Sequence, residues 1–431
     1  TQYAAEDALM TLKLFNKQLE IFKQRGEDEL LSIAFELEFN FIYVLASMEQ
    51  KGIKIDVKLL KEYKDRSLIY LNELTQNIYE ACGETFNINS PKQLGVILFE
   101  KLELASSKKT KTGYSTDESV LESLKNEHKV VPLLLKYREA FKLHSTYIEP
   151  LLELGLKDSE NRVFSSFLHT GTTTGRLSSK NPNLQNIPVG AFSDIQIRKA
   201  FVASDGYKLV GVDYSQIELR LLAHFSQDEA LVNAFKQDLD IHLQTAIKIF
   251  GEDEAKDKRA IAKTINFGLL YGMGSKKLSD TLGISTKEAK AYIDSYFEAF
   301  KSVKDYFKSI EDEAIEKGYV KTLLNRKRLF DFQGVSPMLK AAYLREAVNT
   351  LFQGSAADLI KLSMIKIHLK YKDNPNVKML LQIHDELIFE VKDDYIKEVT
   401  EDIKDIMESI FVLNVPLKVS VGVANSWQDL K

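Results

Sequence analysis

Apolar residues recur at helical spacing through most of this chain and change to alternating or continuous runs in a few places. Helical periodicity covers 1–45 (with a polar break near 25–28), 46–157, 226–336 and 339–371. Alternation predicts a strand at 162–169, and short apolar runs predict strands at 208–212 and 417–423. The order predicts an α+β protein whose sheet region is interrupted by a helical insertion.

Carboxylates stand where two of the predicted strands end. Asp213 follows the run 208–212, and two branched apolar runs within 377–391 flank His384-Asp385-Glu386, which predicts a β-hairpin with acids at its turn. Acids at a hairpin turn are usually solvated, but here both flanking strands read as buried. Two such carboxylates can hold two divalent ions about 3.5–4 Å apart. Mg²⁺ suits them, because it prefers oxygen ligands and keeps waters and phosphates in its shell.

The segment 258–274 reads as a helix that places Arg259, Lys263, Phe267 and Tyr271 at intervals of four. Such residues drift by only about 40° per step, so all four share one side. Two cations followed by two aromatic rings could grip a nucleoside triphosphate. On this helix alone, salt bridges and aromatic packing explain the stripe at least as well.

Several polar residues predict where helices begin. Asp56 is an expected cap, Ser90-Pro91 reads as a helix start, and capping boxes are expected at Ser115-x-x-Glu118 and Ser285-x-x-Glu288.

Three polar segments are open to two interpretations. The loop 106–115 carries Lys108, Lys109 and Lys111, and is either a solvated turn or a basic tip for phosphates. The irregular loop 170–188 carries Arg176 among small hydroxyl residues and is either a surface loop or a contact to nucleic acid. Arg345, Asn349 and Gln353 share one helix face, which is either merely polar or directed at a minor groove.

Composition narrows the classes of protein. The formal net charge of the 431 residues is −4, so any site for a polyanion must be a local basic groove. The single cysteine, Cys82, excludes a disulfide framework and a cysteine-rich metal site, and fits a reducing compartment. No signal peptide is recognised, and no apolar run approaches the ~18 residues of a spanning helix. Because the chain begins at Thr1 inside a predicted helix, we expect it to be a piece of a longer protein.

Taken together, these segments resemble the family A DNA polymerases of the bacterial DNA polymerase I type. Residues 213–220 are similar to motif A, and 384–386 to motif C. The pattern RxxxKxxxFGxxYG of motif B is matched from Arg259 to Gly272, and TxTGRLSSxxPNLQNIP at 172–188. With the helix that bears Arg345, five motifs occur in family order and spacing. The resemblance covers about 46–431 and extends weakly to 3–7, which is similar to the last motif of a proofreading exonuclease.

The resemblance implies roles for individual residues. The implied catalytic residues are Asp213, Asp385, Glu386 and Lys263, with Asp213 and Asp385 as ligands of two Mg²⁺ ions, Mn²⁺ being an alternative, and Lys263 as general acid. The implied nucleotide-binding residues are Arg259, Lys263, Phe267, Tyr271, His242, Glu218 and Gln216, of which Glu218 and Tyr271 would disfavour ribonucleotides. The implied DNA-binding residues are Arg176, Arg345, Asn349, Gln353, His384, Lys108, Lys109 and Lys111. His144 stands where a more basic residue would suit phosphate better, which implies a weak or pH-dependent contact.

The implied fold is the right-hand polymerase fold with an antiparallel palm sheet and helical fingers. Its parts would be an exonuclease remnant at 1–45, the thumb at 46–159, the palm at 160–225 and 337–431, and the fingers at 226–336. The chain would thus be a fragment of Klenow type. Because the exonuclease's earlier acidic motifs are missing, we expect no proofreading.

The implied function is template-directed addition of deoxynucleotides to a primer 3′-OH with release of pyrophosphate, in replication and repair. The expected partners are primer–template DNA and deoxynucleoside triphosphates, with no membrane, for a monomer in the bacterial cytoplasm, associated with the nucleoid. Two alternatives use the same residues: a metal-dependent nuclease, which would need no triphosphate site, and a catalytically silent DNA-binding module, in which Asp213, Asp385 and Lys263 would not be needed.

Overall fold

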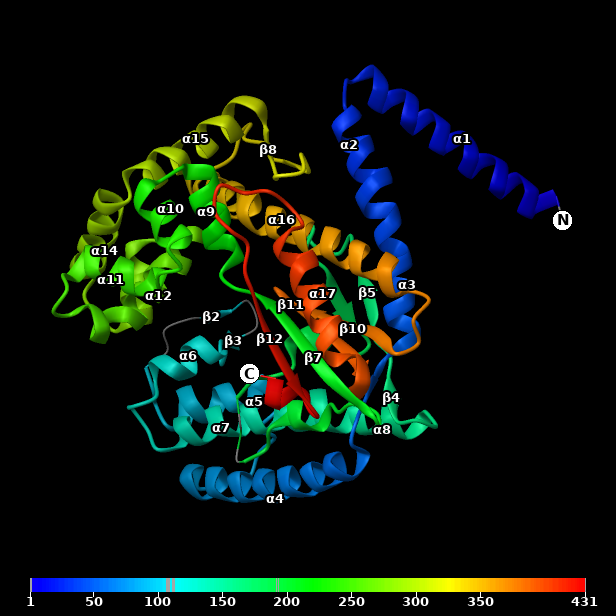
Figure 1. Cartoon of the computed structure of the whole chain (residues 1–431). Helices are drawn as coiled ribbons and strands as arrows, with labels where there is room; N and C mark the ends of the chain where they lie inside the picture. Colours follow the sequence, from blue (N-terminus) through cyan, green and yellow to red (C-terminus); the bar gives the residue numbers. More distant parts are fainter. Residues whose placement is uncertain (1, 106–108, 111–112, 191, 193, 431) are drawn as a thin grey trace. The chain divides into compact units, whose positions relative to one another are not determined.

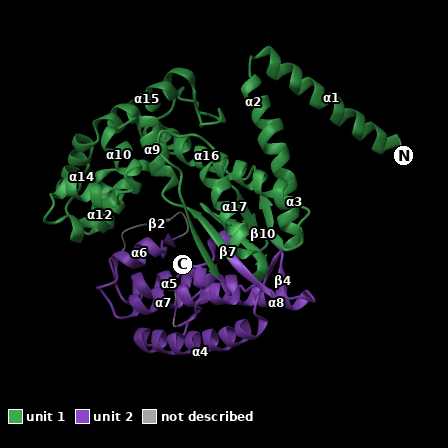
Figure 2. Ribbon diagram, viewed as in Figure 1, with its two compact units in different colours: residues 1–51, 166–181, 210–423 green, residues 52–165, 182–209, 424–431 purple. Residues whose placement is uncertain are grey.

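The computed structural model describes residues 2–105, 109–110, 113–190, 192 and 194–430. They form two compact units (Figure 2). The first unit comprises 1–51, 166–181 and 210–423, and the second comprises 52–165, 182–209 and 424–431. The division passes through strand β7. Both helices and sheet are present, so the predicted α+β class is confirmed.

A four-stranded sheet organises the first unit. Its order is β10 (Val377–Ile383), β11 (Glu386–Lys392), β7 (Tyr207–Tyr214) and β12 (Val419–Ala424) (Figure 1). Strands β10 and β11 pair antiparallel, which confirms the predicted hairpin. Nearly all of their side chains are buried, as expected of continuous branched apolar runs that are covered on both faces.

Helix α16 (Pro337–Tyr371) is the central helix of this unit. Ser336 caps it by accepting a hydrogen bond from the backbone N–H of Leu339, and Pro337 occupies its first turn. It packs against β10 and against helices that include α3 (Phe39–Lys51), α9 (Ile217–Ser226), α15 (Lys301–Lys317) and α17 (Ile396–Glu408). Functional side chains on α16 are therefore held by a packed helix.

The predicted helical insertion is present between β7 and α16. After α9 it contains α10 (Glu229–Lys236), α11 (Ile241–Phe250), α12 (Ala255–Leu270), α13 (Ser275–Leu282), α14 (Thr286–Ala299) and α15, and then the basic hairpin of β8 (Tyr319–Lys321) and β9 (Lys327–Leu329). Ser285 caps α14 as predicted. The predicted helix 258–274 was too long, because α12 ends at Leu270 and Gly272 takes a positive φ of 71° that continues no helix.

The N-terminal helices confirm the predicted break near 25–28. Helix α1 (Gln2–Gln24) buries none of its residues, and α2 (Asp28–Ser32) continues through a π-helical stretch (Ile33–Glu38) into α3. By length and composition alone, the 24-residue helical segment Asp28–Lys51 is long and apolar enough to cross a membrane. The prediction that no segment meets this criterion was wrong. Part of its apolar character serves the protein core, where α3 packs on α16 and β10.

The second unit is mostly helical. It contains α4 (Val57–Cys82), α5 (Pro91–Val96), α6 (Glu118–Ser123), α7 (Val130–Lys142) and α8 (Glu149–Lys157), with the short strand pairs β1 (Ile53–Lys54)–β4 (Arg162–Val163) and β2 (Lys109–Thr110)–β3 (Gly113–Tyr114). Its core lies among α4, α5, α6 and α7. Asp56 and Ser90 cap helices as predicted.

Two local predictions were wrong. The residue that caps α6 is Asp117, which accepts from the N–H of Val120, while Ser115 donates its hydroxyl to Asp117 instead of capping. The predicted strand 162–169 is interrupted and forms β4 and β5 (Ser166–Leu168) separately. Strand β5 pairs with β6 (Ser178–Lys180), and β6 lies inside the loop that was predicted to hold no regular element. The pairing involves only three residues of each strand, too few to give a recognisable pattern in the sequence.

Candidate active site

Asp213 and Asp385 come from neighbouring parts of the sheet, strand β7 and the β10–β11 hairpin. Asp213 lies near the end of β7, and Asp385 lies in the two-residue turn between β10 and β11. The backbone N–H of Tyr214 donates to the carbonyl of Asp385 over 3.1 Å, which joins these two ends. His384 takes a left-handed φ of 54°, as tight two-residue turns require.

The surroundings of the Asp385 carboxyl group disfavour its ionised form. Its Oδ1 is buried without a hydrogen-bond partner. Burial, together with repulsion from Glu218 and Asp213, raises the pKa of Asp385 to about 7, although Arg176 opposes the shift. An orphaned carboxylate oxygen beside a second carboxylate is the arrangement that a divalent cation would stabilise. The donor set therefore fits Mg²⁺.

These two carboxylates do not form a complete metal site by themselves. Within the described residues, no group of three or more His, Cys, Asp or Glu side chains could hold a metal ion. Further ligands would have to be waters and substrate oxygens, as is usual for Mg²⁺. Glu386 is the first residue of β11 and is 5% exposed, so it lies in the sheet beside the turn.

Glu218 connects the sheet to helix α12. It lies in the first turn of α9, after Gln216 in a left-handed conformation, and is 2% exposed. Arg176 forms an ion pair with its Oε1, and the hydroxyl of Tyr271 forms a hydrogen bond with it. Burial nevertheless raises the pKa of Glu218, and its Oε2 has no partner.

Helix α12 carries the predicted stripe. Lys263 and Arg259 are exposed, and Arg259 Nε donates to Asp240 Oδ2 over 2.6 Å. The rings of Phe267 and Tyr271 stack with centroids 6.4 Å apart, and Tyr271 follows the last helical residue. The four predicted residues therefore share a side, with the cations toward the start of the helix and the aromatics at its end.

His242 supports α12 from α11. It is 2% exposed, and its Nδ1 lies 3.1 Å from the Nδ2 of Asn266, which can only donate, so this ring nitrogen accepts. Burial lowers the pKa of His242 to about 4. The imidazole is therefore neutral near pH 7. Sequence reasoning missed Asn266, a polar residue on the buried side of α12 that gave no sign of its partner.

The predicted face of α16 lies against the end of α12. Arg345, Asn349 and Gln353 recur every fourth residue, and Asn349 Oδ1 is buried without a hydrogen-bond partner. A Cβ added to Gly272 would lie 2.7 Å from Arg345 Cγ, so only glycine allows this approach. The turn after Tyr271 thus rests on the stem of Arg345.

Some predicted residues do not join this group. Lys108 and Lys111 lie outside the described residues, and Lys109 belongs to β2, where only its backbone is described. His144 is buried and bonded to Ser67 over 2.8 Å, and burial lowers its pKa. The weak phosphate contact at His144 therefore stays a prediction, and the buried ring offers it little surface.

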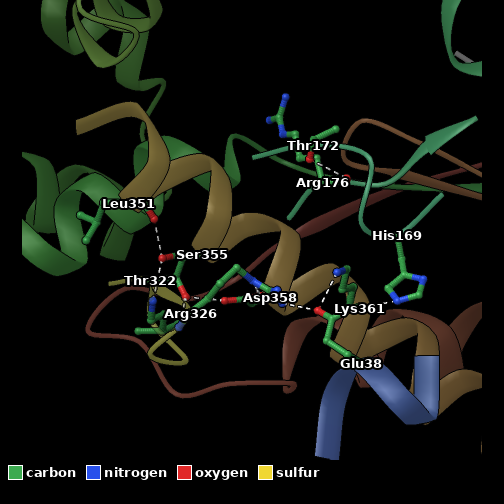
Figure 3. A network of polar contacts seen from close by, with 11 residues as sticks. Glu38, His169, Thr172, Arg176, Thr322, Arg326, Leu351, Ser355, Asp358 and Lys361 are labelled. Atoms are coloured by element: carbon green, nitrogen blue, oxygen red, sulfur yellow. Dashed lines mark hydrogen bonds and ion pairs between the residues drawn. The ribbon is translucent and has the colours of Figure 1, made fainter. Parts of the chain in front are cut away.

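Sequence reasoning also missed a cluster of charged side chains next to the loop of Arg176 (Figure 3). Its members are Glu38, Arg326, Asp358 and Lys361. Arg326 lies on the basic hairpin of β8 and β9, and its acidic partners lie far away in the sequence.

Comparison with known proteins shows which family the chain belongs to. The sequence model of the family described as DNA polymerase family A matches residues 57–429. DNA polymerase I of Helicobacter pylori strain J99 is 49% identical over 98% of this chain and 47% of its own length, and that of Bacillus subtilis strain 168 is 45% identical over 100% and 49%. The chain thus spans about half the length of these relatives. The POL domain of Pol1 from M. smegmatis, solved in complex with DNA primer-template and dNTP, is similar with a TM-score of 0.88 and 37% identity, over 95% of this chain and 73% of that one. The chain belongs to DNA polymerase family A.

Proposed function

We propose that this chain is a template-directed DNA polymerase that adds deoxynucleotides to a primer 3′-OH and releases pyrophosphate. The observation that carries the proposal is that Asp213 and Asp385 are held side by side and that the buried Oδ1 of Asp385 has no hydrogen-bond partner. Tyr271, at the aromatic end of the stripe on α12, interacts electrostatically with Asp385. Family membership and the primer–template complex of the similar Pol1 domain support it.

Asp213 and Asp385 would hold two Mg²⁺ ions, with Mn²⁺ as an alternative. When bound, these cations would favour deprotonation of the primer hydroxyl and stabilise negative charge on the transferred phosphoryl group. The contribution of the chain is to hold two carboxylates together at a rigid sheet, where a bound cation would displace the proton of Asp385 into solvent.

The exposed cations of α12 would bind the triphosphate. Arg259 and Lys263 would hold the β- and γ-phosphates, with His242 behind them as a neutral hydrogen-bond donor through Nε2. Lys263 would protonate the leaving pyrophosphate. Phe267 would pack on the incoming sugar and base, and Glu218 with Tyr271 and Gln216 would crowd the sugar 2′ position.

Donor side chains from three segments would bind the DNA. Arg176, Gln353 and His384 would contact the primer terminus or the minor groove. Arg345 and Asn349 would contact the template-side duplex. The lysines at 108, 109 and 111 would reach the phosphates.

The family also supports a division into polymerase parts, which we propose as follows. Residues 46–159 would form the thumb, 226–336 the fingers, and 160–225 with 337–431 the palm, after an exonuclease remnant at 1–45. We place the chain in the bacterial cytoplasm, near the nucleoid, as a monomer without a membrane partner, because its relatives are bacterial DNA polymerases.

We further propose that the chain does not proofread. Asp7 lies on α1, none of whose residues is buried, and the described residues hold no cluster of three acids that would make a second metal site. An exonuclease of the two-metal kind needs several carboxylates around its cations.

Primer extension tests both proposals. Extension of matched primers with Mg²⁺ is expected, together with its loss in Asp213→Ala and Asp385→Ala and with no removal of a mismatched 3′ nucleotide. Degradation of the 3′ end without nucleotides would instead identify a nuclease. Tight primer–template binding without incorporation at any Mg²⁺ concentration would identify a silent DNA-binding module.

A further inference from the structure

The tip of the β8–β9 hairpin is fastened onto α16 by hydrogen bonds. Thr322 donates its hydroxyl to Asp358 Oδ2 over 2.5 Å, and the N–H of Leu323 donates to Ser355 Oγ over 2.8 Å. The N–H of Arg326 in turn donates to Thr322 Oγ1 over 3.1 Å. The backbone that carries Arg326 is therefore fixed relative to the central helix.

The Arg326 guanidinium is held from two sides (Figure 3). Its Nε and Nη2 donate to Asp358 Oδ1 over 2.9 and 2.8 Å, and Nη2 also pairs with Glu38. Asp358 is fully buried, and Glu38 is paired in addition with Lys361 over 2.8 Å. Two acids balance two bases, so the plane of the guanidinium is restrained by charge as well as by hydrogen bonds.

The loop that carries Arg176 rests on this guanidinium. Gly175 has a φ of +78°, and a Cβ there would lie 2.8 Å from Arg326 Nε and 3.2 Å from its Cζ. Thr172 closes the loop by donating its hydroxyl to the carbonyl of Arg176 over 2.8 Å. On the neighbouring side, a Cβ on Gly354 of α16 would lie 3.1 Å from the carbonyl oxygen of Thr174.

We propose that Arg326 is a positioning residue, which sets the loop 172–176 so that Arg176 meets Glu218 beside Asp385. The inference rests on the proposed polymerase function, in which Arg176 acts at the primer end. A flat guanidinium offers the backbone of Gly175 a face that a lysine ammonium lacks, although a lysine would still balance Asp358 and Glu38. The alternative is that the ion-pair cluster only stabilises the fold and has no effect on the position of Arg176.

The test is single-nucleotide incorporation by the whole chain carrying Arg326→Lys, alone and combined with Arg176→Ala. Because small misplacements of a working group are costly, Arg326→Lys is expected to lower kcat about tenfold to a hundredfold. With Arg176 already removed, Arg326→Lys should add less than about a twofold loss, because coupled residues are not additive. An equal loss in both backgrounds, or no loss, would overturn the proposal.

Arg328→Lys is the matched control. It makes the same change two residues away, on a side chain that pairs with Glu346 and Thr350. Its kcat should stay within about twofold of the unmodified chain. A loss in Arg328→Lys as large as that in Arg326→Lys would show a general effect of the hairpin and overturn the proposal.

If Arg326→Lys fails to fold, Gly175→Ala probes the same contact from the side of the loop. The added Cβ meets the guanidinium, so incorporation is expected to fall in the same way, and unchanged incorporation would overturn the proposal. An unmodified chain that incorporates nothing would refute the polymerase function itself. An active chain that is unaffected by Arg326→Lys would refute the positioning role alone.

Discussion

The backbone N–H of Tyr214 donates to the carbonyl of Asp385 over 3.1 Å, so one hydrogen bond joins the two segments that carry the candidate metal ligands. The distance between the backbones of Asp213 and Asp385 is therefore fixed by the sheet. Two carboxylates kept together in this way repel each other, and this repulsion contributes to the raised pKa of Asp385. We therefore expect the two carboxylates to lower the stability of the folded chain, a cost that is retained because the reaction needs them.

Asp385→Asn should therefore abolish extension while it stabilises the fold. A carboxyl whose folded pKa of about 7 exceeds its ordinary value of 3.8 reduces stability as the pH rises between these values, because the unfolded chain ionises first. At pH 8 in EDTA the variant should be more stable than the unmodified chain, by about 1–2 kcal/mol after allowance for the partial exposure of Asp385. Urea unfolding at pH 8 and at pH 4, where the difference should vanish, checks this.

Mg²⁺ supplies the control for that prediction. A cation that binds only the folded chain raises its stability, so Mg²⁺ should raise the Tm of the unmodified chain and leave that of Asp385→Asn nearly unchanged. An Asp385→Asn chain that is less stable than the unmodified one at pH 8 without metal would show that the Asp385 carboxylate is stabilising.

The sequence was sufficient to predict elements whose form depends on short-range order. The hairpin of β10 and β11, the stripe on α12 and the caps Asp56 and Ser90 all follow from spacing within a few residues. The incorrect capping box at Ser115 shows the limit of such patterns, because Asp117 two residues later competes as a better cap.

Partners that lie far apart in the chain could not be predicted in this way. Glu38 and Arg326 are 288 residues apart, and nothing near Glu38 distinguishes it from a solvated acid on an amphipathic helix. The same holds for His242 and Asn266, which meet only because α11 packs on α12. Motif resemblance singled out candidate residues, whereas the contacts that support them required the structure.

His242 should make the protein less stable as the pH falls below 6.5. Its folded pKa of about 4 lies below the ordinary 6.5, so the unfolded chain takes up a proton first, and stability declines as the pH falls through this window. At pH 5 the cost is about 2 kcal/mol. His242→Gln can accept from Asn266 without titrating, so its loss of unfolding free energy between pH 7.5 and pH 5 should be smaller by this amount. Equal losses in both chains would contradict the assignment.

Discrimination against ribonucleotides should depend on the volume of Glu218. Glu218→Ala opens space beside Tyr271 and should raise the kcat/KM ratio of ribonucleotide to deoxynucleotide about tenfold to a hundredfold. Glu218→Gln keeps the volume and a hydrogen-bond acceptor for the Tyr271 hydroxyl, so this ratio should stay close to that of the unmodified chain. If Glu218→Gln relaxes discrimination as strongly as Glu218→Ala, the charge that pairs with Arg176 matters more than crowding.

Asp240→Asn should tighten nucleotide binding, because the two oxygens of Asp240 have separate tasks. Oδ1 caps α11 by accepting from the N–H groups of His242 and Leu243, and Oδ2 holds Arg259. Asparagine caps helices as well as aspartate does, so stability should be retained while Arg259 is released to the triphosphate. Since exposed ion pairs contribute about 0.2–1 kcal/mol, KM for the nucleotide should fall by up to about fivefold. In Arg259→Ala, KM should rise, and adding Asp240→Asn should then have no effect. A higher KM in Asp240→Asn alone would mean that Asp240 orients Arg259 toward the phosphates and does not compete with them.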